Sequence, residues 1–246
     1  MAGIEIKALA GVALAFILLN GSDAFAQAEP QQAGVNPVLF DRNSHPYGKS
    51  METWAEKWWA WVMSVPAANN PNITATGACE AGQSGPVFFL PASALGAKGV
   101  IRNCTVQHGQ AIGVTLSSVL NDFPCPDPTF HPAPGQSLFD FLVAGAVEAN
   151  GDIVTIETTL DGVPLQDLLS YHFVSDDLFF FQGDLSLQTT FDSCITGSLQ
   201  PSAVDSYFAI FKPLSPGHHE ITRRIVNAHG VVSGPNTANI EVLEAH

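Results

Sequence analysis

The stretch that decides the fold is "GKSMETWAEKWWAWVMSVP" (residues 48–66), which holds all four tryptophans of the 246-residue chain. Ser50 is suited to cap a helix and Pro66 to end one, so the sequence predicts a helix over residues 50–65. At 3.6 residues per turn, one stripe of this helix carries six apolar side chains. They are Met51, Trp54, Trp58, Trp61, Val62 and Val65.

An apolar stripe at helical spacing usually faces a core. Each tryptophan of the stripe can bury about 150–250 Å². At about 25 cal/mol per Å², three of them would contribute on the order of 10 kcal/mol before entropy is subtracted. The stripe therefore predicts that the helix packs on a sheet. If the helix stayed exposed instead, the stripe would be a surface for a partner.

The rest of the chain has the pattern that supplies such a sheet. Short runs rich in β-branched and aromatic residues alternate with Gly, Pro and Asn, and one further run has helical spacing. The sequence predicts a mainly β fold, an antiparallel β-sandwich of the immunoglobulin-like or jelly-roll-like type, with the Trp-rich helix packed on it and one further short helix. Strands are predicted over 86–90, 99–106, 111–120, 152–160, 163–174, 177–182, 203–214, 218–226 and 236–245, a helix over 137–150, and a proline-rich loop over 121–135.

Residues 1–26 have the layout of a secretory signal peptide, with Lys7, an apolar run over 8–19 and an A-x-A site at its end. The apolar run is too short for a membrane anchor, which needs about 20 apolar residues. We expect cleavage after Ala26, with Ala28 as the alternative. The protein is then secreted or periplasmic, with no membrane span after the signal is removed.

After cleavage, two regions remain. Residues 27–47 are polar and contain prolines, which predicts an extended N-terminal tail. Residues 48–246 are predicted to form a single β-sandwich domain, because this length suits one large all-β domain.

Four cysteines follow the signal segment: Cys79, Cys104, Cys125 and Cys194. An even number in an exported chain indicates disulfides, and four cysteines allow three pairings. We favour Cys79 with Cys104, which closes a short loop, and Cys125 with Cys194, which ties the proline-rich loop to a later strand. A zinc site is the alternative, but the chain has no C-x-x-C pair.

The charge of the chain limits its partners. The formal net charge is −14 at pH 7, so nucleic acid and anionic membrane surfaces would be repelled. The eight histidines are scattered through turns and strands, and a site such as Asp127, His131 and His172 would have to be assembled by folding. The sequence predicts no metal and no cofactor.

Trp59 lies beyond the edge of the apolar stripe, on the side of the helix that carries Glu52 and Glu56. An aromatic plane beside carboxylates is typical of carbohydrate-binding sites, so these three residues are the candidate ligand site. Paired carboxylates also serve glycoside hydrolysis. The sequence therefore leaves two functions open. One is a non-catalytic binding or cell-envelope role with a carbohydrate or envelope partner. The other is an extracellular hydrolase of a polysaccharide or related polymer, with Glu52, Glu56 or residues of the 121–135 loop in its site.

Several segments together resemble a family of secreted bacterial proteins of unsettled function. They are "YGKSMETWAEKWWAWVMSVPAANNP", "TGACEAGQSGPVFFL", "RNCTV" and "KPLSPGHHEI", and the W-x-x-E/K-W-W-x-W helix is the most specific of them. The C-terminal segment from Leu214 to Ala245 resembles the final hairpin of immunoglobulin-like domains. The resemblance implies export, disulfides and a sandwich, and it assigns no catalytic residue.

Overall fold

Ten strands and two α-helices form the framework of the structure, a computed structural model that describes residues 36–74, 77–92, 99–230 and 232–245. The predicted signal segment (1–26) and residues 27–35 of the predicted tail lie outside the described residues. The elements are α1 (Met51–Ser64), β1 (Val87–Leu90), β2 (Ile101–Val106), β3 (Ala111–Asp122), α2 (Leu138–Asn150), β4 (Ile153–Leu160), β5 (Val163–Pro164), β6 (His172–Val174), β7 (Phe179–Gln182), β8 (Leu199–Phe211), β9 (Gly217–Asn227) and β10 (Val232–Val242), with 3-10 helices at Pro46–Gly48, Ala67–Asn69, Leu168–Ser170 and Leu185–Leu187.

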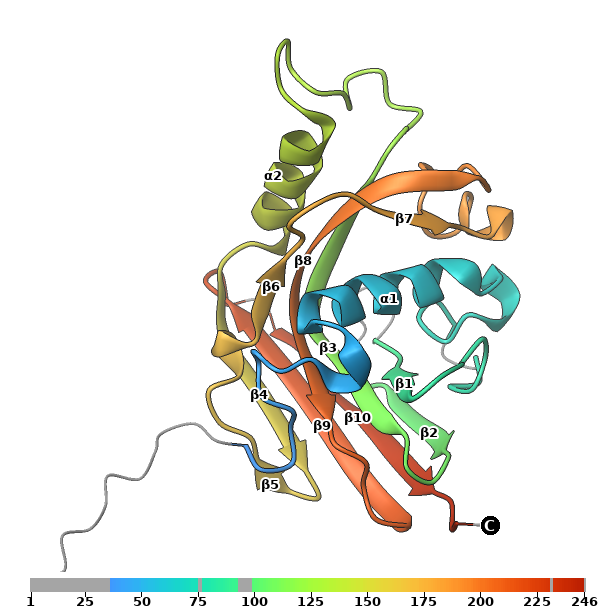
Figure 1. Ribbon diagram of the computed structural model, residues 1–246, viewed down its shortest axis with the longest axis vertical. Helices are drawn as coiled ribbons and strands as arrows, with labels where there is room; N and C mark the ends of the chain where they lie inside the picture. Colours follow the sequence, from blue (N-terminus) through green and yellow to red (C-terminus); the bar gives the residue numbers. More distant parts are fainter. Residues whose placement is uncertain (1–35, 75–76, 93–98, 231, 246) are drawn as a thin grey trace, which may run out of the picture. The chain divides into compact units, whose positions relative to one another are not determined.

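The strands form two five-stranded sheets, which confirms the predicted sandwich (Figure 1). Sheet A has the order β1-β3-β8-β6, and β7 also pairs with β8. Sheet B has the order β2-β10-β9-β4-β5. Most neighbours are antiparallel, and β1 and β2 add parallel pairings to β3 and β10 at the edges. The predicted C-terminal hairpin is β9 and β10.

Helix α1 lies across sheet A, where it contacts β3, β6, β7 and β8 (Figure 1). The Ser50 hydroxyl accepts a hydrogen bond from the Thr53 amide at 3.1 Å and so caps the helix, as predicted. All six residues of the predicted apolar stripe are buried. The stripe is therefore a core face of this chain and not an exposed partner surface.

Each tryptophan of α1 also donates its indole N–H to a different segment. Trp54 donates to the Pro46 carbonyl before the helix, and Trp58 donates to the Leu90 carbonyl at the end of β1. Trp61 donates to the carbonyl of Ala81 in the loop after the helix, and Trp59 donates to the hydroxyl of Ser118 in β3. Helix α1 thus connects four parts of the chain by polar contacts in addition to its apolar packing.

Residues 38–40, predicted as part of the extended tail, lie against sheet A. The Phe40 amide donates to the Ile210 carbonyl at 2.9 Å, and the Lys212 amide donates to the Val38 carbonyl at 2.8 Å. Leu39 forms a β-bridge with Phe211 and is 2% exposed. Residues 38–40 therefore pair with the end of β8, and Leu39 belongs to the core.

The prediction of one strand over 163–174 is wrong in its middle. β5 ends at Pro164, a 3-10 helix occupies Leu168–Ser170, and β6 begins at His172. β5 belongs to sheet B and β6 to sheet A, so the chain crosses between the sheets here. Asp167 accommodates the crossing with a left-handed backbone (φ 52°).

Helix α2 and the disulfides agree with the sequence analysis. Ser137 caps α2, Gly151 ends it, and the helix packs on β3 and β8. Cys79 pairs with Cys104 in β2, and Cys125 in the proline-rich loop pairs with Cys194 before β8. Among the described residues, neither helix has the length and apolar character needed to cross a bilayer.

We expect Trp54→Phe to lower the free energy of unfolding by about 1–3 kcal/mol. The buried Pro46 carbonyl would keep only the longer bond from the Lys49 amide, at 3.3 Å, and the smaller ring would leave a space in the core. Trp59→Phe is the matched control, since Ser118 can still donate to the Asp205 carbonyl and Trp59 is only half-buried. Urea denaturation measures both variants. A loss for Trp54→Phe no larger than that for Trp59→Phe would contradict this account.

Candidate functional site

A cavity of about 340 Å³ lies where α1, β3 and sheet B meet, and we call it the junction cavity. Its position follows from the strand pairing. β1 pairs with β3 only as far as Val114, whereas β3 continues to Asp122. Beyond Val114, this edge of β3 has no strand partner among the described residues, and the cavity occupies the space beside it.

The walls of the junction cavity are largely apolar and aromatic. Trp58 and Trp59 of α1 are in edge contact, with ring centroids 5.1 Å apart, and Phe191 lies 6.4 Å from Trp59. β3 contributes Leu116, and sheet B contributes apolar residues including Ile153. Aromatic walls around a concave volume are typical of small-molecule sites.

Hydrogen bonds hold two polar lining residues of β3 in place, Ser117 and Ser118. The Ser118 hydroxyl accepts from the Trp59 indole at 2.7 Å, which orients the Trp59 ring. The Ser117 hydroxyl donates to the Asn150 side chain at 2.6 Å. The site is therefore largely pre-formed, because both side chains are fixed by partners within the protein.

Arg223 is the charged residue of the lining. Its Nη1 donates to the Thr115 carbonyl at 2.7 Å, and its Nη2 donates to the Pro91 carbonyl at 2.8 Å. The side chain is buried, and burial, followed by the nearby charge of Arg102, lowers the pKa of Arg223 to about 10. The guanidinium is therefore still charged at neutral pH.

Sequence reasoning missed Arg223, although the chain carries a signal for it. In the strand run 218–226, Ile221, Arg223 and Ile225 alternate with Thr222 and Arg224. Alternate residues of a strand share a face. An arginine between two isoleucines therefore occupies a core-facing position, where a charge is unusual.

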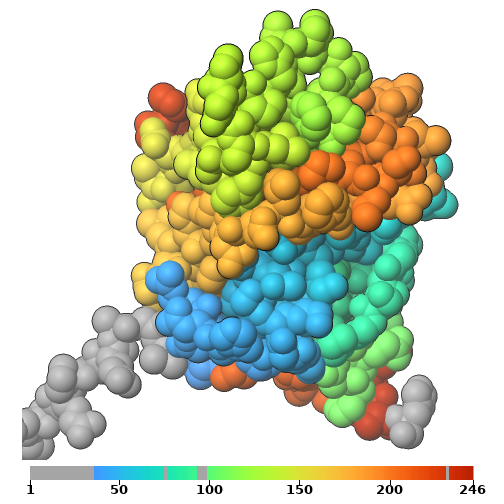
Figure 2. All heavy atoms as spheres, turned by 45° about the horizontal axis from the view of Figure 1, so that its top comes forward, coloured from blue at the N-terminus to red at the C-terminus, as the bar shows by residue number. Residues whose placement is uncertain are grey.

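The structure separates the residues of the predicted ligand site. Trp59 lines the junction cavity, but neither Glu52 nor Glu56 does. The Glu56 carboxylate accepts from the Ser175 hydroxyl at 3.0 Å, and the Glu52 carboxylate accepts from the Asp176 amide at 2.9 Å. Figure 2 shows the surface of α1, in blue, against the orange segments that include the loop after β6.

Burial is the main cause that raises the pKa of Glu56 to about 7, and Glu52, Asp176 and Asp177 raise it further by repulsion. Burial also raises the pKa of Glu52. Both carboxyls thus face an acidic stretch of the loop after β6 and not an aromatic plane. A shared role for Trp59 and the two glutamates in ligand binding stays a prediction.

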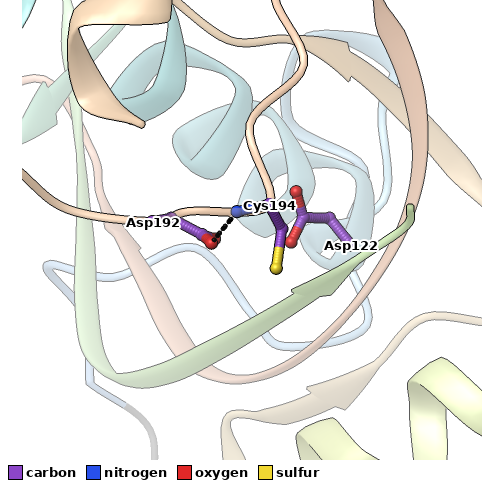
Figure 3. A group of neighbouring side chains, drawn as sticks. All are labelled: Asp122, Asp192 and Cys194. Carbon is purple, nitrogen blue, oxygen red and sulfur yellow. Dashed lines mark hydrogen bonds between the residues drawn. The ribbon is translucent and has the colours of Figure 1, made fainter. Parts of the chain in front are cut away.

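A second carboxyl cluster lies beside the Cys125–Cys194 disulfide. Ligand atoms of Asp122, Asp192 and Cys194 lie within 4.8 Å of one another (Figure 3). The sulfur of Cys194 is engaged in the disulfide and is not a thiolate, so this group lacks the ligands of a typical metal site. Burial, followed by repulsion from Asp192, raises the pKa of Asp122 to about 7, and Gln200 donates a hydrogen bond to its carboxyl.

His172 does not join the proline-rich loop. Its Nε2 lies 2.9 Å from both carboxylate oxygens of buried Asp205, and its ring stacks on Tyr207 with centroids 4.3 Å apart. The Asp127 carboxylate accepts from Thr129, and His131 contacts the Pro132 carbonyl. The contacts of these residues are therefore local or within sheet A.

Comparison with known proteins gives little further information. No known family profile matches the chain, and no curated protein matches it. Among solved structures, the chain matches the structure of PbICP-C in complex with falcipain-2 at a TM-score of 0.22 and 13% identity. The match covers 65% of this chain and 98% of that chain, and a TM-score this low supports no argument about function.

The pKa of Asp122 predicts how stability depends on pH. The ordinary value is 3.8 and the folded value is about 7, so the folded state holds the extra proton between these values. The free energy of unfolding contributed by Asp122 therefore falls as pH rises from about 4 to about 7, by an amount on the order of 1 kcal/mol or above. We expect Asp122→Asn to reduce the loss of stability between pH 5 and pH 8, measured by thermal melts.

Asp127→Asn is the control for this measurement, because the Asp127 carboxylate is exposed and bonded only to its own turn. Its melts should keep the pH dependence of the unaltered protein. If Asp122→Asn keeps that dependence as well, Asp122 does not hold a proton in the folded state at neutral pH.

Proposed function

We propose that the protein is an exported, non-catalytic binding protein that holds a small, largely apolar ligand in the junction cavity. The observation that carries the proposal is the cavity itself, with its aromatic walls of Trp58, Trp59 and Phe191 and its volume of about 340 Å³. Ligand pockets in proteins usually have volumes of about 300–1,000 Å³ and apolar walls with a few placed polar groups.

Export is supported by the two disulfides, because such bonds persist in oxidising compartments. The signal peptide predicted over residues 1–26 points the same way. We propose that the chain is secreted or periplasmic after cleavage. We also propose membership in the family of secreted bacterial proteins that its tryptophan motif and segment order resemble.

The class of ligand we propose differs from the carbohydrate considered first. A carbohydrate site combines an aromatic plane with several free hydrogen-bonding groups. In the junction cavity, the side chains of Ser117, Ser118, Asn72 and Asn236 are bonded within the protein. The Thr115 hydroxyl has no partner among the described atoms, and no carboxylate lines the described walls. These features favour an apolar ligand.

The hydrolase alternative rests on Glu52 and Glu56. A carboxyl with a pKa of about 7, such as that of Glu56, suits a general acid. Both carboxyls, however, bond to the loop after β6 and lie outside the lining of the cavity. The binding role therefore agrees better with the geometry.

We test the proposal with N-phenyl-1-naphthylamine, an uncharged apolar probe whose emission rises in a dry site. Ile153→Trp should fill part of the cavity and weaken probe binding by about tenfold or above. Val154→Trp is the matched control, because Val154 is next to Ile153 in the strand but is 48% exposed and does not line the cavity. It should bind the probe as the unaltered protein does.

Two outcomes would contradict the proposal. One is an absence of probe binding to the unaltered protein, and the other is equal probe affinity in both tryptophan variants. New reducing ends released from a polysaccharide panel, and lost in Glu56→Gln, would instead support the hydrolase alternative.

A further inference from the structure

The charge lining the junction cavity contrasts with that of the chain. The protein has 23 acidic and 9 basic residues, yet no aspartate or glutamate is among the described residues that line the cavity. The ionic side chain there is Arg223, which is 8% exposed. The described lining of this largely apolar cavity thus holds a positive charge and no negative one, although the protein as a whole is acidic.

A second buried arginine strengthens this imbalance. Arg102 of β2 is 6% exposed and donates to the carbonyls of Thr74 and Gly77, while its Nε has no partner among the described atoms. Its charge is close enough to lower the pKa of Arg223. The ion pairs of the described residues use Arg224 and three histidines, and none uses Arg102 or Arg223.

The carbonyl contacts of Arg223 explain its position but not its charge. They connect sheet B to β3 and to the end of β1 through two of the five N–H groups of the guanidinium. A neutral amide could donate two such bonds without the cost of a buried ion. Buried charges in proteins are normally paired or bound to an ion, because desolvation of an unpaired charge is unfavourable.

We propose that the ligand of the junction cavity is a small monocarboxylate with an apolar body, and that its carboxylate pairs with Arg223. This inference rests on the proposed function and adds the chemical class of the ligand. The planar guanidinium matches a carboxylate, which accepts two parallel hydrogen bonds from it. The apolar body would lie against Trp58, Trp59 and Phe191.

A carboxylate fits this site better than a phosphate. Arg102 does not line the cavity, so Arg223 is the one guanidinium in the described lining that a ligand can reach, and it balances one negative charge. A phosphate monoester carries close to two charges at neutral pH, and the second would be buried without a partner. The net charge of −14 also repels multiply charged anions from the protein as a whole.

The test compares octanoate with octanamide, which has the same length and no charge, by calorimetric titration at pH 7. We expect octanoate to bind about tenfold tighter or above, because a hydrogen bond to a charged group contributes more than one between neutral groups. Arg223→Gln should remove this preference. Arg224→Gln is the matched control, because the Arg224 side chain is next to Arg223 in β9 but is 40% exposed, does not line the cavity and pairs with Glu157.

The outcomes separate this inference from the proposed function. If octanamide binds as tightly as octanoate, or if only the uncharged naphthylamine probe binds, the cavity is a binding site but not one for carboxylates. If no probe binds, the proposed function fails as well. If Arg223→Gln does not fold, Arg223→Lys replaces it; this variant keeps the charge and should keep a weakened preference for octanoate over octanamide. The comparison of the two ligands in the unaltered protein still tests whether the cavity prefers a carboxylate. A full preference for octanoate in folded Arg223→Gln would overturn the role of Arg223.

Discussion

The structure depends on the polar side of four tryptophans as much as on their apolar area. A stripe of rings would hold α1 on any suitably apolar sheet, but each indole N–H must find an acceptor when it is buried. Here the acceptors lie before the helix, after it, at the end of β1 and in β3. These four bonds determine which surface of the sandwich the helix covers, and in which orientation.

The position of α1 in turn creates the candidate site. The helix lies over β3 where β1 has already ended, so an open strand edge is covered by tryptophans on one side and by sheet B on the other. An unpaired edge is normally a liability, since it presents free backbone groups. In this protein, Arg223 binds one of those groups, the Thr115 carbonyl, and the remaining space is the cavity.

Local patterns predicted what local forces determine. The stripe of α1, its Ser50 cap and the helix predicted over 137–150 follow from spacing and residue type, and all three are present. The crossing between sheets at 165–171 depends on distant strands, so a continuous strand was predicted there. Helical periodicity places Glu56 and Trp59 on the same side of α1. The Glu56 carboxylate, however, accepts a hydrogen bond from Ser175, which is 119 residues away in the loop after β6. The alternation of Arg223 with Ile221 and Ile225 is visible in the sequence. That Arg223 lines a cavity depends on the position of sheet A, which the local sequence does not determine.

The consecutive carbonyls of Leu90 and Pro91 accept hydrogen bonds from two different layers, one from Trp58 of α1 and one from Arg223 of sheet B. The helix cannot leave sheet A without disturbing the residue that anchors the other sheet. The amides of α1, β1 and β9 should therefore exchange hydrogen with similar free energies of opening, because each of these elements is hydrogen-bonded to the others through Leu90 or Pro91. The adjacent peptide units of Leu90 and Pro91 thus join α1 to both sheets.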